Sequence, residues 1–178
     1  MKLEVGMMLE NIIYDTPYAK GVSLKEGLKG KTMLLFLRYY GCTLCQYDML
    51  MLKEAYDKVE AVGGTVKVVL QSDPAALAEE LGEEGYYPFE IICDPECALY
   101  KAYEIDPAGS MAELAGGNIM EKITAAKALG LSHGRYEGIE EQLPAAFVVD
   151  NEMNITYAHY GKNGTDIPSP EEIVELLR

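Results

Sequence analysis

Apolar and polar positions follow two different periods along the chain, one typical of buried strands and one typical of helices. Residues 32–37 and 65–70 are apolar and β-branched runs, as expected of central strands buried on both faces. Between them, residues 46–61 carry apolar side chains at helical spacing, and Gly63-Gly64 ends this expected helix. Further elements are expected at 11–14 (strand), 72–81 (helix with a proline near its start), 89–93 (strand) and 94–103 (helix).

The last third of the chain predicts a strand hairpin. Residues 145–150 and 155–160 are expected strands separated only by a short polar turn, which predicts an antiparallel pair. A final helix is expected to begin near Ser169 and to end near Leu177. The element order β-α-β-α-β-α, insertion, β-β-α therefore predicts an α/β fold in which helices cover both faces of a mixed sheet.

The segment 104–142 fits this alternation least well. Residues 111–129 are rich in helix formers but are interrupted by Gly116-Gly117, and three further glycines favour a loop after them. A lid over a site, a dimer contact and an ordinary insertion all agree with this pattern. The chain is expected to form one domain over residues 1–178, with the insertion at about 104–142.

Composition and charge restrict the classes of partner. The chain has 178 residues, and its 29 acidic against 15 basic residues give a net charge of −14. Such a surface repels nucleic acid and anionic membranes, so neither is an expected partner. The first residues lack the pattern of a signal peptide, and no apolar run is long enough to span a bilayer, so we expect a cytoplasmic protein.

Two cysteines at the end of the first buried strand carry the clearest chemical signal. Cys42 and Cys45 form a C-x-x-C where the apolar run 32–37 passes into helix-forming sequence. Amide groups and the helix dipole at a helix N-terminus stabilise a thiolate. A second thiol three residues further on, after a gap of two residues, can close a disulfide within one helical turn. The pattern indicates a redox protein in which Cys42 is the nucleophile and Cys45 the resolving thiol, although two buried thiols that merely pack would share this spacing.

Two other cysteines leave alternatives open. Cys93 follows an expected strand and Cys97 the start of the next helix, so a relay thiol at the same sheet edge is one interpretation and simple packing is another. All four thiols together could bind zinc. The second pair is distant in sequence and lacks zinc-ribbon spacing, so the redox interpretation is favoured and no metal is expected.

Arg38 is the positively charged residue nearest to the motif. It lies four residues before Cys42, and a cation at that separation can lower the pKa of a thiol. A solvated or carboxylate-paired arginine is equally consistent with the sequence. His133 and His159 are isolated, with no Asp or Ser arrangement nearby that suggests a triad.

Residues beside the cysteines are expected to shape a substrate groove. Tyr40 and Thr43 flank Cys42 in the sequence, and Leu143 and Pro144 immediately precede the strand at 145–150. Backbone next to Pro144 could hold an extended substrate segment by main-chain hydrogen bonds.

With these residues in view, the chain resembles the thioredoxin-fold, peroxiredoxin-like superfamily of alkyl hydroperoxide reductase and thiol-specific antioxidant proteins, over nearly its whole length. Gly41-Cys42-Thr43-Leu44-Cys45 resembles the C-x-x-C branch of that superfamily, and Cys93-Asp94-Pro95-Glu96 its second βα unit. Leu143-Pro144 before Phe147-Val148-Val149-Asp150 resembles its cis-proline site and the strand after it. The resemblance implies a three-layer α/β/α fold with a mixed central sheet, and a cis peptide bond at Pro144.

Two features that usually accompany peroxide reduction in this superfamily are missing. Counting back from Cys42, the Pro and Thr of P-x-x-x-T-x-x-C fall on Leu35 and Tyr39, and the arginine usual before the 145–150 strand has no counterpart. The C-x-x-C and Pro144 therefore favour thiol–disulfide exchange. The resemblance implies no cofactor, a protein disulfide or hydroperoxide as substrate, and a thiol reductant such as thioredoxin; a homodimer is compatible with it.

Two other functions stay open at this point. In a thiol peroxidase, Cys42 would become a sulfenic acid that Cys45 captures. In a non-catalytic redox sensor or binding module, the disulfide would switch a surface formed by residues 104–142.

Overall fold

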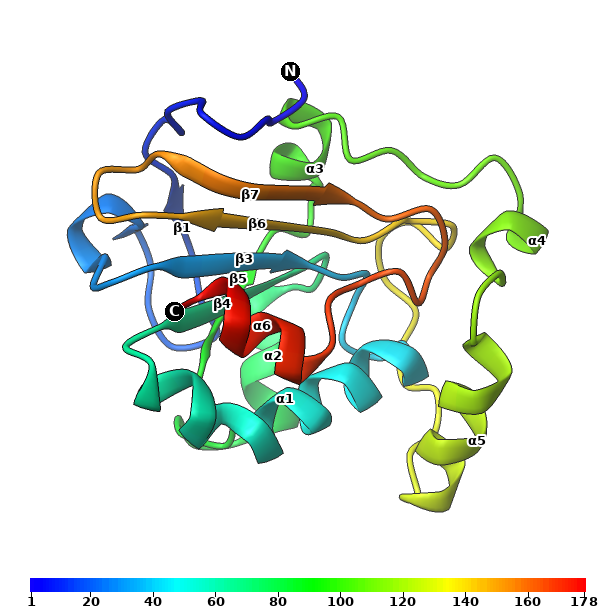
Figure 1. The fold of residues 1–178 in the computed structure, drawn as a ribbon. Helices are drawn as coiled ribbons and strands as arrows, with labels where there is room; N and C mark the ends of the chain where they lie inside the picture. Colours follow the sequence, from blue (N-terminus) through cyan, green and yellow to red (C-terminus); the bar gives the residue numbers. More distant parts are fainter.

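A mixed five-stranded sheet forms the centre of the molecule (Figure 1). The computed structural model describes all residues from 1 to 178. The strand order is β5-β4-β3-β6-β7, in which β3, β4 and β5 are parallel while β6 is antiparallel to both of its neighbours. The strands are β3 (Thr32–Phe36), β4 (Thr65–Leu70), β5 (Glu90–Cys93), β6 (Ala145–Val149) and β7 (Ile155–Tyr160). The expected mixed sheet and the β6–β7 hairpin are confirmed.

Side chains of the central strand alternate between two hydrophobic cores. Met33 and Leu35 of β3 belong to the core under one face, and Leu34 and Phe36 to the core under the other. Helices α1 (Thr43–Ala61), α2 (Pro74–Leu81) and α6 (Pro170–Leu176) cover the first face. The opposite face is covered by α3 (Ala98–Ala102), β1 (Ile13–Tyr14), β2 (Val22–Ser23) and the short 3-10 helix at Lys25–Gly27.

Two expected elements begin later than the sequence indicates. The third helix was expected from residue 94 but begins at Ala98, because Cys97 adopts a left-handed backbone with φ 59°. The Asp94 carboxylate accepts hydrogen bonds from the N–H groups of Ala98 and Leu99, both at 2.9 Å, and so caps this later start. The strand expected at 11–14 is restricted to β1.

The segment 104–142 contains two short helices and a returning loop. Helix α5 (Ile119–Ala128) stands beside the N-terminal end of α1, whereas α4 (Met111–Leu114) lies next to the chain after β7, where the N–H of Gly164 donates to the carbonyl of Leu114 at 2.8 Å (Figure 1). The expected break at Gly116-Gly117 separates the two helices. Residues 129–144 then lead back to β6. No helix in the structure has both the length and the apolar character that crossing a membrane requires.

One buried hydroxyl supports the strand ends that lead to the cysteines. Tyr100, which is 1% exposed, has one hydroxyl proton that is shared between the carbonyl oxygens of Leu37, at 2.7 Å, and Val69, at 2.9 Å. These are the points where the chain leaves β3 and where β4 ends. The position of the turn after β3 therefore depends on a contact from the opposite core.

We expect Tyr100→Phe to lower the free energy of unfolding by about 1–3 kcal/mol, because both buried hydrogen bonds are lost. Tyr103→Phe is the control, since the Tyr103 hydroxyl makes no hydrogen bond. Urea denaturation of both variants measures the effect, and equal stability of the two would contradict this assignment.

Candidate active site

Cys42 is the N-cap residue of α1, directly after the turn that follows β3. Its backbone is extended, and its Sγ accepts a hydrogen bond from the N–H of Cys45 at 3.4 Å. The carbonyl of Cys42 accepts from Gln46 at 3.0 Å, as in a regular first helical turn. A negative sulfur at this position is stabilised by the helix dipole. Both thiols are free, and Cys42 and Cys45 are 1% and 4% exposed.

Arg38 contacts the sulfur of Cys42 directly. Its Nη2 lies 3.0 Å from Cys42 Sγ, and its backbone N–H donates to Cys45 Sγ at 3.4 Å. The hydrogen bond from the Cys45 thiol is the largest cause that lowers the pKa of Cys42. The charge and hydrogen bond of Arg38 add to it against the effect of burial, and the pKa falls to about 5.

Cys45 has the opposite character. Burial raises the pKa of Cys45, and its hydrogen bond to Cys42 and the negative charge of Cys42 raise it further. Cys42 is therefore the more acidic thiol of the pair and Cys45 the less acidic one. This asymmetry is what a nucleophile and a resolving thiol require.

The cysteine pair lies in the wall of a pocket of about 510 Å³. Helices α4 and α5 and the loop after them form the far wall, so the segment 104–142 encloses the site. The polar lining lies near the cysteines and includes Asp48, His133 and Glu140. The apolar lining consists of Leu37, Leu44, Met111, Leu114, Ala115, Ile119, Ile123, Leu131 and Pro144.

The loop 129–144 passes directly over the cysteine turn. The N–H of Gly134 donates to the carbonyl of Gly41 at 2.8 Å. A Cβ at position 41 would lie 2.2 Å from the Arg135 carbonyl oxygen, so only glycine permits this approach. The residue before Cys42 is thus part of the contact between loop and motif.

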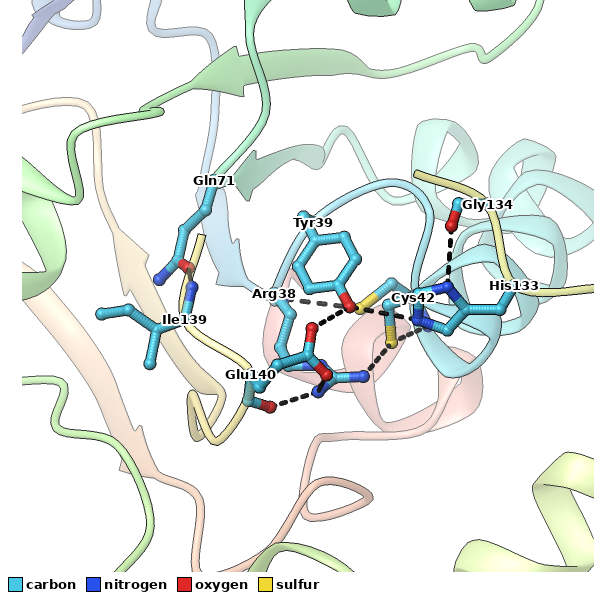
Figure 2. A network of polar contacts seen from close by, with 9 residues as sticks. Arg38, Tyr39, Cys42, Gln71, His133, Gly134, Ile139 and Glu140 are labelled. Atoms are coloured by element: carbon cyan, nitrogen blue, oxygen red, sulfur yellow. Dashed lines mark hydrogen bonds and ion pairs between the residues drawn. The ribbon is translucent and has the colours of Figure 1, made fainter. Parts of the chain in front are cut away.

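Sequence reasoning missed two polar residues of this site, Glu140 and His133. Glu140 accepts hydrogen bonds from Arg38 Nη1 through its carbonyl and from the Tyr39 hydroxyl through its carboxylate (Figure 2). His133, expected to be isolated, lies with Nε2 3.1 Å from the Tyr39 hydroxyl and its ring stacks on Tyr136. These contacts span about a hundred residues of sequence, so no local pattern reveals them.

The residues expected to form a substrate groove are divided by the structure. Thr43 and Pro144 line the pocket. Tyr40 does not, because its hydroxyl lies 3.1 Å from that of Tyr87 and its N–H donates to Ser72. Leu143 is also outside the lining.

The expected cis bond at Pro144 is wrong, since every peptide bond in the chain is trans. The carbonyl of Pro144 accepts from the N–H of Gly161 at 2.8 Å. An extended trans backbone at this position continues directly into β6, which begins at Ala145.

Cys93 and Cys97 lie outside the pocket, in different cores on opposite faces of the sheet. Burial, followed by the charge of Asp73, raises the pKa of Cys93 to about 12, and burial also raises the pKa of Cys97. No group of three or more His, Cys, Asp or Glu side chains could hold a metal ion, so the four-thiol zinc site does not form. His159 pairs with Asp166 at 2.8 Å away from the pocket, which the sequence did not indicate.

One buried ion pair joins the pocket's outer helix to α1. Lys122 of α5 lies 2.9 Å from Asp48 of α1, and the Asp48 side chain is 9% exposed. Burial raises the pKa of Asp48 to about 6, against the opposing charge of Lys122. The fold therefore disfavours the ionised carboxylate relative to the unfolded chain.

We expect Asp48→Asn to become more stable relative to the unsubstituted protein as pH rises from about 4 to about 6. A raised carboxyl pKa contributes stability below the unfolded-state pKa, and this contribution disappears as Asp48 ionises in the folded state. Urea denaturation of both proteins at pH 4 and pH 7 measures the difference, and the titration of Cys42 is common to both. A stability difference that does not vary with pH would refute this account.

Replacing Arg38 with Met removes the cation that contacts Cys42. We expect the pKa of Cys42 to rise and its iodoacetamide alkylation near pH 6 to slow at least ~10-fold, as one unit of pKa implies. Mass mapping of alkylated Cys42 across pH measures this. Arg135→Met is the matched control, because Arg135 is exposed and pairs with Glu137 at 3.2 Å; if both variants gave the same profile, Arg38 would have no such role.

Comparisons with known proteins agree with this geometry. Residues 5–158 match the model of the AhpC/TSA family. No curated protein matches the sequence. Among solved structures, a peroxiredoxin-like protein from Aquifex aeolicus is 15% identical, with a TM-score of 0.66 over 99% of this chain and 87% of that chain.

Two further structures represent both kinds of thiol chemistry. A putative thiol:disulfide interchange protein DsbE from Chlorobium tepidum is 14% identical, with a TM-score of 0.62 over 99% of this chain and 100% of that chain. Peroxidoxin BcpB from Mycobacterium tuberculosis is 9% identical, with a TM-score of 0.68 over 99% of this chain and 97% of that chain. At such identities the likeness shows the fold, and the thioredoxin-like, peroxiredoxin-like fold implied by the resemblance is confirmed.

Proposed function

We propose that this chain, which belongs to the AhpC/TSA family, is a thiol–disulfide oxidoreductase. Membership of that family already makes the protein a thiol-based oxidoreductase or peroxidase. Cys42 is the nucleophile and Cys45 the resolving thiol. The observation that carries this proposal is the geometry of the pair: Cys42 is the N-cap of α1, and its Sγ accepts from the N–H of Cys45 and lies 3.0 Å from Arg38 Nη2. These contacts lower the pKa of Cys42, while burial raises that of Cys45. Two thiols that merely pack would both have raised pKa values.

The first step forms a mixed disulfide. The Cys42 thiolate attacks one sulfur of a substrate R–S–S–R′, the Cys42–S–R bond forms, and the R–S–S–R′ bond breaks. The leaving R′S⁻ takes a proton from solvent. The negative charge on Cys42 is then gone, which removes one of the causes that raise the pKa of Cys45.

The second step releases the substrate. Cys45 gives up its proton and attacks the sulfur of Cys42, the Cys42–Cys45 disulfide forms, and RS⁻ leaves with that proton as RSH. The substrate gains two electrons and two protons in total. A thiol reductant of the thioredoxin type would then return the protein disulfide to two thiols.

A thiol peroxidase is the second candidate, favoured by the family match and by the largely apolar pocket. There the Cys42 thiolate attacks the terminal oxygen of ROOH, giving a sulfenic acid and, with one proton, ROH. Cys45 then condenses with the sulfenic acid and releases water. Both candidates end in the same Cys42–Cys45 disulfide and differ in the bond that is reduced.

Single-cysteine variants test the proposal. We expect the unsubstituted protein to turn over hydroxyethyl disulfide with dithiothreitol, Cys42→Ser to be inactive, and Cys45→Ser to accumulate a mixed disulfide that mass spectrometry detects. Cys93→Ser is the control, because Cys93 lies outside the pocket. Cumene hydroperoxide in the same assay separates the candidates. If the protein reduced only the peroxide, it would be a thiol peroxidase and the proposed disulfide exchange would be wrong. If it reduced neither the disulfide nor the peroxide, the result would favour the non-catalytic binding module.

A further inference from the structure

We propose that Glu140 is a positioning residue, which holds the Arg38 guanidinium against the sulfur of Cys42. The inference rests on Cys42 being the nucleophile of the proposed function. Glu140 belongs to the loop 129–144 and is separated from Arg38 by about a hundred residues. The two meet because that loop crosses the turn between β3 and α1.

The guanidinium of Arg38 is held on two sides. Its Nη2 contacts Cys42 Sγ at 3.0 Å, while its Nη1 donates to the Glu140 carbonyl and lies 3.5 Å from the Glu140 carboxylate. A planar guanidinium has donors in a fixed fork, so fixing Nη1 also fixes the direction of Nη2. The Arg38 side chain is 15% exposed, so little water competes for these donors.

The carboxylate of Glu140 is itself held in place. Tyr39 has a single hydroxyl proton, and a carboxylate can only accept, so this proton points at Glu140. Nε2 of His133 lies 3.1 Å from the same Tyr39 oxygen, and its Nδ1 lies 2.8 Å from the carbonyl oxygen of Gly134. The Glu140 carboxylate is thus held by the Tyr39 hydroxyl beside Arg38, and His133 contacts that hydroxyl as well (Figure 2).

Two buried glutamines fix the backbone on either side of Glu140. Gln71, which directly follows β4, accepts from the Ile139 N–H at 2.8 Å and donates to the Gln142 side chain at 3.0 Å. The N–H of Gln71 donates to the carbonyl of Arg38 at 2.7 Å. One residue therefore sets the position of both Arg38 and the segment that carries Glu140. Gln71 and Gln142 are each 1% exposed, so these bonds are protected from water.

Two effects of the Glu140 carboxylate on the Cys42 thiolate have opposite signs. As a negative charge near the sulfur, it disfavours the thiolate and raises the pKa of Cys42. As a partner that orients Arg38, it favours the thiolate and lowers that pKa. Removing the side chain therefore lowers the pKa if charge alone matters, and raises it if positioning is the larger effect. The sign of the change decides between them.

The test compares Glu140→Ala with Glu141→Ala. Both substitutions remove one negative charge from the same loop, but the Glu141 side chain makes no ion pair or hydrogen bond with Arg38. We expect the pKa of Cys42 to rise by about one unit in Glu140→Ala, a ~10-fold slower alkylation at a pH below that pKa. In Glu141→Ala it should stay unchanged or fall slightly. The readout is the alkylation rate of Cys42 across pH with mass mapping.

Tyr39→Phe provides a second variant without a change of charge. Losing the hydroxyl leaves the Glu140 carboxylate unheld, and we expect the pKa of Cys42 to rise here too. If circular dichroism shows that Glu140→Ala is unfolded, Tyr39→Phe decides. The other ionisable side chains that face Cys42 or its pocket are Cys45, Asp48, Lys127, His133 and Tyr136, and they are unchanged in all three variants.

An unchanged or lowered pKa of Cys42 in a folded Glu140→Ala variant would overturn the inference, as would an equal rise in Glu141→Ala. Alkylation needs no turnover, so this result is independent of the disulfide and peroxide assays. If the unsubstituted protein turns over neither substrate, the proposed function fails whatever Glu140 does. If it is active and Glu140→Ala keeps a low Cys42 pKa, only the role of Glu140 fails.

Discussion

A single negative sulfur at the start of α1 is the constraint on which the rest of the site depends. Cys42 is almost completely buried, and a buried charge is costly unless donors and an opposite charge compensate it. The compensating groups are the thiol and the N–H of Cys45, together with the guanidinium of Arg38. All of them come from one turn between β3 and α1. The main contribution of the sheet is to hold that turn still.

The segment after residue 104 adds enclosure to this turn. Helices α4 and α5 supply apolar side chains to the wall opposite the cysteines, and the loop after them supplies polar ones. The apolar wall excludes water from the sulfur, which strengthens the contact between Cys42 and Arg38. The polar loop provides acceptors for the donors of Arg38 and Tyr39. The apolar wall and the acceptors for Arg38 and Tyr39 thus come from the same insertion.

Local sequence patterns predicted the parts of the molecule that local physics determines. The apolar run at 32–37, the helix after it and the C-x-x-C at their junction are all within a few residues of one another, and the structure has them as expected. Tyr40 was placed in the pocket because it adjoins Cys42, yet its hydroxyl contacts Tyr87, so proximity in sequence was misleading.

The contacts that escaped prediction are long-range. Glu140 and His133 reach Tyr39 only once the sheet has brought β6 beside β3, and no periodicity encodes that meeting. One signal was available in the chain: Gln71 is a polar residue directly after an apolar strand. Buried polar side chains need partners, so its position indicated a second polar segment nearby.

The position of Arg38 also explains how the chain departs from the pattern of its family. The arginine usual before the 145–150 strand is missing, but a guanidinium still contacts the reactive sulfur, from the strand end that also carries the cysteines. Because Arg38 is close to Cys42 in sequence, the loop 129–144 is not needed to bring the two together. The loop is needed to orient the Arg38 guanidinium toward the sulfur. The loop before β6 therefore supplies the acceptor that directs this guanidinium. The arrangement holds a positive group in contact with the sulfur of Cys42, where it favours a thiolate.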